Sequence, residues 1–423
     1  MHSHPRRGLS VLMTADTVGG VWTYALELSR CLSEHRVLVS LATMGAPPSE
    51  AQRREAQAVG GLSLLESTFR LEWMDDPWED VARAGDWLLG LERALSPDVV
   101  HLNGYCHGAL PWRAPTLMVG HSCVLSWWEA VKGEPAPARY DRYREEVRRG
   151  IGAASRLVAP TWAMLRALTQ HYGEHPEGRV IPNGREPAGS GWGQRRRAES
   201  TGLKGAWLGS TRGEAHGLEA KEDLVVCATR VWDEAKNVGA LAKAAQGLSW
   251  KVFVAGDAGD AGDAGSERRR GLEGVTLLGR LEREEVLRWL GRAAIFALPA
   301  RYEPFGLSAL EAAGAGCALV LGDIPSLREI WGNAAVFVPP DAPEQLREAI
   351  EALIQDPTRR QELGARAQSR SLRFGGGQMG RHYVTTYADL AESRVAALRE
   401  SDGGQQGSWG QDIEQRDSRP CAS

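Results

Sequence analysis

The chain has 423 residues, of which 43% are hydrophobic and 25% are charged, and its formal net charge is −4. This length exceeds one ordinary domain and indicates two. The small net charge gives no reason to expect nucleic acid as the main partner. No apolar run approaches the roughly 20 residues of a membrane-spanning helix, which leaves peripheral membrane contact open.

The first half of the chain alternates strand-like and helix-like segments. Arg6 and Arg7 precede an apolar run in the manner of a signal peptide, but the run is short and enters Asp16 directly, so a buried first strand is predicted over 9–13. A Gly19-Gly20 turn follows, and apolar spacing predicts a helix over 22–34. Further strands are predicted over 36–43, 98–102, 115–119, 156–159 and 179–184.

Between about residues 185 and 223 the composition changes to mainly Gly, Ser, Arg and Glu, which indicates a linker enlarged by an insertion. A second series follows, with strands over 224–228, 251–255, 275–278, 295–299, 318–321 and 335–338 and helices over 238–248, 283–293, 307–314, 343–354 and 357–368. An Asp-Ala-Gly triplet repeat at 257–265 lacks the ligand spacing of a calcium loop and is interpreted as a solvated loop.

Short strands separated by helices predict parallel sheets with right-handed crossovers. The predicted fold is therefore α/β, with two doubly wound Rossmann-like domains facing each other across a cleft. The predicted ranges are 1–185 for the N-terminal domain, 186–222 for a flexible linker, 223–373 for the C-terminal domain, 374–398 for a C-terminal helix, and 399–423 for a disordered tail.

Several common site types find no match in the sequence. Six scattered cysteines without C-x-x-C pairs favour reduced thiols in a cytoplasm over disulfides or zinc. A formal G-x-G-x-x-G match at 375–380 does not follow a strand, so the dinucleotide-binding interpretation fails. There is no P-loop and no D-x-D motif, so neither a metal nor a cofactor is expected.

Glu303 and Glu311 are eight positions apart, the first on a loop after a predicted strand and the second on the helix that follows. Ligands of open α/β sheets bind at the carboxyl ends of strands, which makes this segment a candidate site. The intervening Pro304-Phe305-Gly306 suits a shaped loop that offers backbone N–H groups. The alternatives are two solvated glutamates or a general acid/base couple.

Charged and polar residues follow three other predicted strands. Arg230 and Lys236 come after the strand over 224–228 and are suited to neutralising a diphosphate, although a solvated charged loop is the alternative. His101 ends one strand and His121 follows another, and each is either structural or a hydrogen-bond partner of a substrate hydroxyl, with His121 preferred for the latter.

Taken in order, Gly19-Gly20, His121, Ile-Pro-Asn-Gly at 181–184, Arg230 with Lys236-Asn237, and the E-x7-E segment resemble the family 4 retaining glycosyltransferases of GT-B fold. The resemblance covers about residues 8–395, and the E-x7-E segment is its specific part. It implies that 1–185 is the acceptor-side domain, that 223–373 is the nucleotide-sugar donor domain, and that the helix over 374–398 crosses back to the first domain. It implies that Glu311 binds the ribose of a nucleotide-sugar donor and that Glu303 and His121 bind the donor sugar. The remaining implied roles are backbone N–H groups from Phe305, Gly306 and Leu307, diphosphate binding by Arg230 and Lys236, and donor-binding or acceptor-side contacts from Asn237, Gly19, Gly20 and Asn183.

The resemblance implies a metal-independent enzyme that moves a sugar from a UDP-, GDP- or ADP-sugar to a hydroxyl of a glycan, a lipid-linked or a small-molecule acceptor. It would act in the cytoplasm or at the inner membrane face. A nucleotide-sugar epimerase, a phosphorylase-like enzyme and a non-catalytic sugar- or nucleotide-binding protein remain alternatives. Three features depart from the usual pattern, namely the long linker, the triplet repeat and Arg185 after Asn-Gly. Trp127-Trp128 lines an acceptor groove or forms part of the core.

Overall fold

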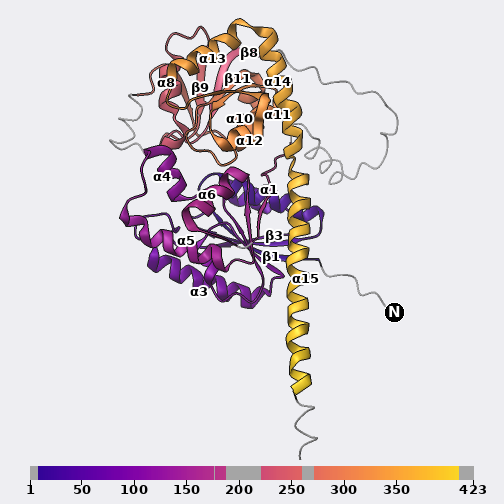
Figure 1. Ribbon diagram of the computed structural model, residues 1–423. Helices are drawn as coiled ribbons and strands as arrows, with labels where there is room; N and C mark the ends of the chain where they lie inside the picture. The colour runs from indigo at the N-terminus through magenta and orange to yellow at the C-terminus, as the bar shows by residue number, and fades with distance from the viewer. Residues whose placement is uncertain (1–7, 176, 187–220, 260–270, 409–423) are drawn as a thin grey trace, which may run out of the picture.

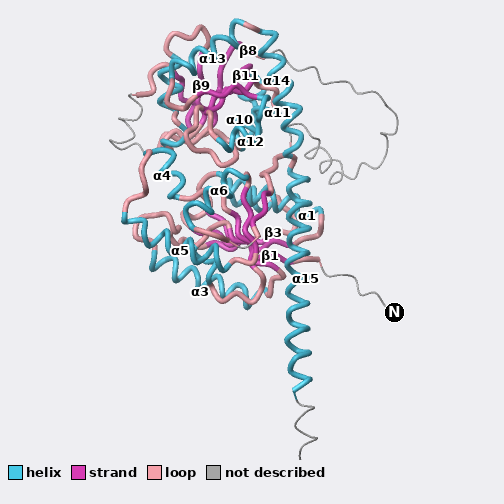
Figure 2. The backbone as a smooth tube through the Cα atoms, in the orientation of Figure 1, coloured by secondary structure: helices cyan, strands magenta, loops and turns pink. Residues whose placement is uncertain are grey.

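The computed structural model describes residues 8–175, 177–186, 221–259 and 271–408. They form two α/β domains, each built on one parallel sheet, as predicted (Figure 1). Figure 2 shows the strands in the middle of each domain with helices around them. Most of the predicted linker, part of the triplet repeat and the last part of the predicted tail lie outside the described residues.

The N-terminal sheet has the strand order β3-β2-β1-β4-β5-β6-β7. Its strands are β1 (Ser10–Asp16), β2 (Leu38–Met44), β3 (Leu62–Glu66), β4 (Val99–Leu102), β5 (Thr116–Val119), β6 (Arg156–Ala159) and β7 (Gly178–Val180). The helices between them are α1 (Gly20–Glu34), α2 (Glu50–Gln57), α3 (Trp78–Leu95), α4 (Val124–Lys132), α5 (Asp141–Ala153) and α6 (Trp162–Tyr172), with the short turns η1 (Cys106–Ala109) and η2 (Ala138–Tyr140). The strand order reverses between β1 and β4, which opens a crevice there.

The C-terminal sheet has the order β10-β9-β8-β11-β12-β13 and reverses between β8 and β11. Its strands are β8 (Glu222–Ala228), β9 (Lys251–Ala255), β10 (Val275–Gly279), β11 (Ala293–Leu298), β12 (Ala318–Gly322) and β13 (Ala335–Val338). The helices are α8 (Val238–Ala245), α10 (Arg283–Arg292), α11 (Leu307–Gly314), α12 (Pro325–Trp331), α13 (Pro343–Gln355) and α14 (Pro357–Ser371), with short turns η3 (Glu234–Lys236), η4 (Gly332–Ala334) and η5 (Leu372–Phe374).

Continuous apolar runs form the central strands because helices cover both faces of a parallel sheet. All six residues of β11 are buried, and this strand lies between β8 and β12. Edge strands carry a weaker signal. The edge strand β3, whose residues are half-buried or exposed, was not predicted.

Helix α15 (Gly376–Ser408) joins the two domains. It begins beside the C-terminal domain and runs along the N-terminal one (Figure 1). Its buried residues Met379, Tyr383, Tyr387 and Leu390 share a core cluster with α1. The helix continues beyond residue 398, where the crossing helix was predicted to end, as far as Ser408.

No helix in the described part of the chain is long and apolar enough to cross a membrane.

Candidate functional site

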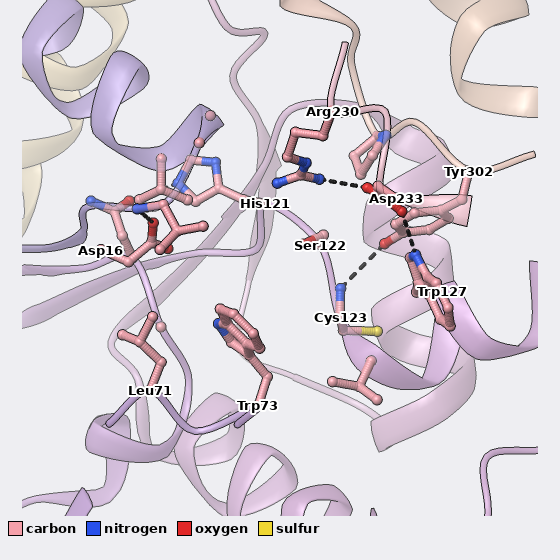
Figure 3. Close-up of a pocket in the computed structure, with 18 of the residues that line it drawn as sticks. Asp16, Leu71, Trp73, His121, Ser122, Cys123, Trp127, Arg230, Asp233 and Tyr302 are labelled. Atoms are coloured by element: carbon pink, nitrogen blue, oxygen red, sulfur yellow. Dashed lines mark hydrogen bonds and ion pairs between the residues drawn. The ribbon is translucent and has the colours of Figure 1, made fainter. Parts of the chain in front are cut away.

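A cavity of about 680 Å³ lies between the two domains. Its walls come from the carboxyl ends of β1, β4 and β5 in one sheet and of β8 and β11 in the other. Both topological switch points therefore open into the same space, which is where open α/β sheets bind their ligands. Figure 3 shows side chains of both domains converging on it.

An ion pair between a buried lysine and a half-buried glutamate joins the loop after β8 to the loop after β11. The Nζ atom of Lys236 lies 2.8 Å from Oε2 of Glu303 and 3.3 Å from the carbonyl oxygen of Tyr302. Burial on its own would raise the pKa of Glu303, but the charge and hydrogen bond of Lys236, the N–H of Phe305 and the charge of Arg230 together outweigh it, and the pKa lies below its usual range. Glu303 is therefore an ionised carboxylate at the cavity wall.

Arg230 spans the cavity toward the first domain. Its Nη2 atom lies 2.8 Å from Oδ2 of Asp233, and its guanidinium carbon stands 5.2 Å from the centre of the Trp232 ring. A Cβ atom added at Gly19 would be only 3.0 Å from Nη1 of Arg230. Gly19 also has a φ of +87°, so both its backbone and its neighbour favour glycine. The glycine loop of one domain thus meets the cation of the other.

The start of α11 also faces the cavity. Gly306, with a φ of +90°, turns the chain into the helix, and Gly306, Leu307 and Ser308 line the cavity. Within the described part of the chain, no side chain caps this helix. The N–H groups of its first turn are consequently available to an anion, which the helix dipole also favours.

The first domain contributes a neutral imidazole and a carboxylate. His121 approaches Asn103, with 2.7 Å between Nε2 and Oδ1, and packs edge-on against Tyr24. Burial lowers the pKa of His121 to about 3, so the ring is uncharged at neutral pH. Asp16 ends β1 and accepts a 2.9 Å hydrogen bond from Val18 N, and burial raises its pKa to about 6 (Figure 3).

Comparison with protein families assigns both halves of the chain. Residues 18–188 match the model "Glycosyltransferase Family 4", and residues 213–370 match "Glycosyl transferases group 1". The chain belongs to the glycosyltransferases of GT-B fold. The matched ranges follow the two domains that enclose the cavity.

Individual relatives of this glycosyltransferase are distant. It is 25% identical over 384 residues to D-inositol 3-phosphate glycosyltransferase from Acidothermus cellulolyticus, which covers 85% of this chain and 79% of the relative. It is 37% identical over 107 residues to glycogen synthase from Mycobacterium tuberculosis, so it spans only about a quarter of that protein (26%). The structure of Anabaena HepE in complex with UDP and glucose has a TM-score of 0.65 at 17% identity, covering 90% of this chain and 100% of HepE, and this likeness concerns the fold.

The cavity brings together most of the predicted residues of the glycosyltransferase site. Its lining contains the four predicted catalytic residues Glu303, Arg230, Lys236 and His121, and the predicted donor-binding residues Phe305, Gly306, Leu307, Gly19, Gly20 and Asn183. These residues come from five loops that are distant in sequence. The spatial grouping is a property of the fold, and what each residue binds remains a prediction.

Asn237 does not line the cavity. Its side-chain nitrogen donates to the carbonyl oxygens of Pro299 and Pro340, at 3.1 Å and 2.6 Å. The residue has a left-handed backbone, with φ of +54°, and this turns the side chain away from that of its neighbour Lys236. Asn237 therefore holds two loops together in the structure, and its role in the donor site stays a prediction.

Glu311 lies beside a small separate recess and does not line the main cavity. Its Oε1 atom is 2.7 Å from Nε of Arg185 and 3.5 Å from Nε of Arg283. Arg185 is buried and also approaches Glu27, at 3.8 Å. The unusual arginine after Asn-Gly thus engages the carboxylate that was expected to face the ribose.

Several residues of the cavity wall were not predicted as site residues, namely Asp16, Asn103, Asp233 and Tyr302. The hydroxyl of Tyr302, in the C-terminal domain, lies 2.8 Å from Ser126 Oγ and accepts a 3.2 Å hydrogen bond from Cys123 N (Figure 3). Asp233 accepts a 3.2 Å bond from Trp127 Nε1. The position of Asp16 and Asn103 directly at strand ends was the available signal, since ligand-facing groups concentrate there.

Proposed function

We propose that this glycosyltransferase transfers a sugar from a nucleoside diphosphate sugar to an acceptor hydroxyl with retention of anomeric configuration and without a metal ion. The observation that carries the proposal is the cavity between the two domains in which Lys236, Arg230 and the start of α11 converge. The structure of the similar HepE with UDP and glucose supports UDP-sugars as the first donors to test.

The leaving diphosphate would be stabilised by two cations and by backbone dipoles. Negative charge grows on the diphosphate as the bond to the sugar breaks, and fixed cations and N–H groups stabilise such charge most effectively in a site shielded from water. Lys236 and Arg230 are each held by a carboxylate, at 2.8 Å in both cases, so their positions are set before a ligand arrives. These groups would take the role that a metal ion has in other transferases.

The sugar would lie between the domains. Glu303 from one side would accept hydrogen bonds from its hydroxyls, and His121 would contact it from the other side. Glu311 would bind the ribose, and this contact would require it to exchange Arg185 or Arg283 for the ribose hydroxyls, or to use its second oxygen.

Retention of the anomeric configuration can arise by two routes, and an experiment on the residues of the cavity distinguishes them. In the proposed front-face route the leaving phosphate helps to deprotonate the acceptor. A double displacement would need a carboxylate nucleophile, and Asp16 is the candidate in the first domain, because both oxygens of Glu72, the other acidic residue there, accept hydrogen bonds from η1 and its preceding residue. Detection of a glycosylated Asp16 peptide by mass spectrometry would contradict the front-face route.

The test is a panel of UDP-, GDP- and ADP-sugars scored for release of nucleoside diphosphate, with and without acceptors and with a chelator. The proposal expects acceptor-dependent turnover that survives chelation, a product with the anomeric configuration of the donor, and loss of activity in Glu303→Gln. Conversion of the donor without any acceptor would indicate an epimerase. Tight binding without turnover of any donor would indicate a non-catalytic binding protein.

A further inference from the structure

A chain of buried hydrogen bonds connects the cavity to α15. His121 Nε2 lies 2.7 Å from Oδ1 of Asn103, and the same oxygen lies 3.1 Å from Nε2 of His101. The Nδ1 atom of His101 is 2.5 Å from the hydroxyl of Tyr387 on α15. His101 and Tyr387 are fully buried, whereas His121 and Asn103 line the cavity.

The partners of Asn103 determine where the protons lie. Its side-chain nitrogen donates to the carbonyl oxygen of Thr14 at 2.7 Å, a contact that the amide oxygen could not make. The amide oxygen therefore faces both imidazoles, and its two lone pairs can accept from both. Each ring must accordingly carry its hydrogen on Nε2.

The remaining ring nitrogens follow from this assignment. Burial lowers the pKa of His101 to about 3, as it does that of His121, so both rings are neutral. A neutral imidazole carries one proton, so Nδ1 is bare in both rings. Nδ1 of His101 accepts from the Tyr387 hydroxyl. Among the described residues, Nδ1 of His121 has no hydrogen-bond partner, although the ring lines the cavity.

We propose that Asn103 is a positioning residue that fixes His121 as the Nε2–H tautomer, so that Nδ1 accepts a hydrogen bond from a hydroxyl of the donor sugar. Tyr387 holds the far end of the chain through His101. The contact with the sugar rests on the function proposed above, whereas the tautomer does not. A bare nitrogen selects a hydroxyl that donates, and a neutral ring places no positive charge beside a sugar that becomes cationic during transfer.

The tautomer can be read directly by NMR on protein labelled with 15N-histidine. Long-range nitrogen–proton spectra distinguish protonated from bare ring nitrogens, and His121→Gln and His101→Gln assign the signals. The wild type should show a protonated Nε2 and a bare Nδ1 in both rings. In Asn103→Ala the His121 ring should lose this single state, and in Tyr387→Phe that of His101 should be disturbed. Tyr383→Phe is the matched control, because Tyr383 stacks on His101 while both ring nitrogens of His101 are bonded elsewhere.

Kinetics test the consequence for the sugar. Loss of the positioned acceptor should raise KM for a donor that turns over by about tenfold in Asn103→Ala, which corresponds to about one hydrogen bond. Affinity for the nucleoside diphosphate alone should be unchanged, which separates this effect from misfolding. Asn103→Asp should keep the tautomer, but its charge should favour the doubly protonated ring and raise KM on the acidic side.

The tautomer assignment and the contact with the donor sugar can be refuted separately. A protonated Nδ1 on His121 in the wild type, or an unchanged His121 spectrum in Asn103→Ala, overturns the tautomer assignment whether or not any donor is found. A confirmed tautomer with an unchanged donor KM in Asn103→Ala overturns the contact with the sugar and leaves the assignment of the enzyme class intact.

Discussion

Replacing Asp16 by asparagine is expected to stabilise the protein at neutral pH. The carboxyl group lies at the cavity wall, and burial raises its pKa from the ordinary 3.8 to about 6, although the hydrogen bond from Val18 N and the charge of Arg230 act in the opposite direction. Asparagine keeps an oxygen that can accept from Val18 N and removes the charge. The variant therefore isolates the cost of ionising a buried carboxyl group.

The direction of the pH dependence of stability follows from the pKa of Asp16 in the unfolded and in the folded protein. The folded protein retains a proton on Asp16 that the unfolded chain has already released, so the stabilisation from this group is complete below about pH 3.8 and is lost as the pH rises through about 6. The difference corresponds to a loss of about 3 kcal/mol at pH 7.5 and of about 0.5 kcal/mol at pH 4. Asp16→Asn should recover most of this loss.

Urea unfolding of the wild type and of Asp16→Asn at these two pH values, followed by tryptophan fluorescence, measures the effect. The variant should gain about 2–3 kcal/mol near pH 7.5 and little near pH 4. Asp75→Asn, at an exposed position on a neighbouring loop, is the control for loss of one carboxylate. A variant that is no more stable than the wild type near pH 7.5 would refute the reasoning, because the carboxylate would then carry no penalty for ionisation.

Three further substitutions test other charged contacts. Lys236→Met should lower nucleoside diphosphate affinity at least about tenfold in calorimetry. The variant also leaves Glu303 without its ion-pair partner. Because Lys236 lowers the pKa of Glu303, the loss of folding stability should be largest above the ordinary carboxyl pKa and should fade on acidification. Arg185→Leu removes a buried cation, leaves the half-buried carboxylate of Glu311 with one less partner, and should destabilise the fold by about 3 kcal/mol in urea unfolding. Glu329→Gln weakens its two hydrogen bonds from the first N–H groups of α6, at 2.8 and 3.0 Å across the domain interface, and should widen the domain separation in solution scattering, at a cost of about 1 kcal/mol.

Exposed cations on the same parts of the chain provide the controls. Lys243→Met, on the exposed face of α8, should leave nucleotide affinity unchanged. Arg179→Leu removes a half-exposed pair with Asp389 and should cost less than about 1 kcal/mol. Equal losses of unfolding free energy in Arg179→Leu and Arg185→Leu would contradict the argument from burial. An unchanged solution shape in Glu329→Gln would show that its two hydrogen bonds do not hold the domains together.

The fold could be predicted from the sequence because the central strands of a parallel sheet have a strong local sequence pattern. Each central strand is a short apolar run followed by a loop and a helix, and Glu303, Arg230 and His121 each follow such a run. Since all these strands point the same way, residues after them necessarily collect at one edge of a sheet. Six strands of each sheet were detectable in this way, and the edge strand β3 was not.

The partners of these residues were not predictable, because they depend on contacts between distant parts of the chain. Tyr387 meets His101 across 286 positions, and Arg185 meets Glu311 across 126. The resemblance placed Asn237 with Lys236 in the donor site, whereas in the structure a left-handed residue at the start of α8 directs the two side chains to different places.

The two sides of the cavity differ in the charge of their side chains. On the side proposed for the diphosphate, Arg230 and Lys236 are charged and each is compensated by a carboxylate 2.8 Å away. On the side of the first domain, burial keeps His121 uncharged. A nucleotide sugar at the point of transfer has the complementary pattern, with negative charge growing on the phosphate and positive charge on the sugar ring. A cation in place of the neutral imidazole would oppose the second of these charges, so the burial that keeps His121 uncharged serves the proposed chemistry, and Asn103 determines which nitrogen of the neutral ring is bare.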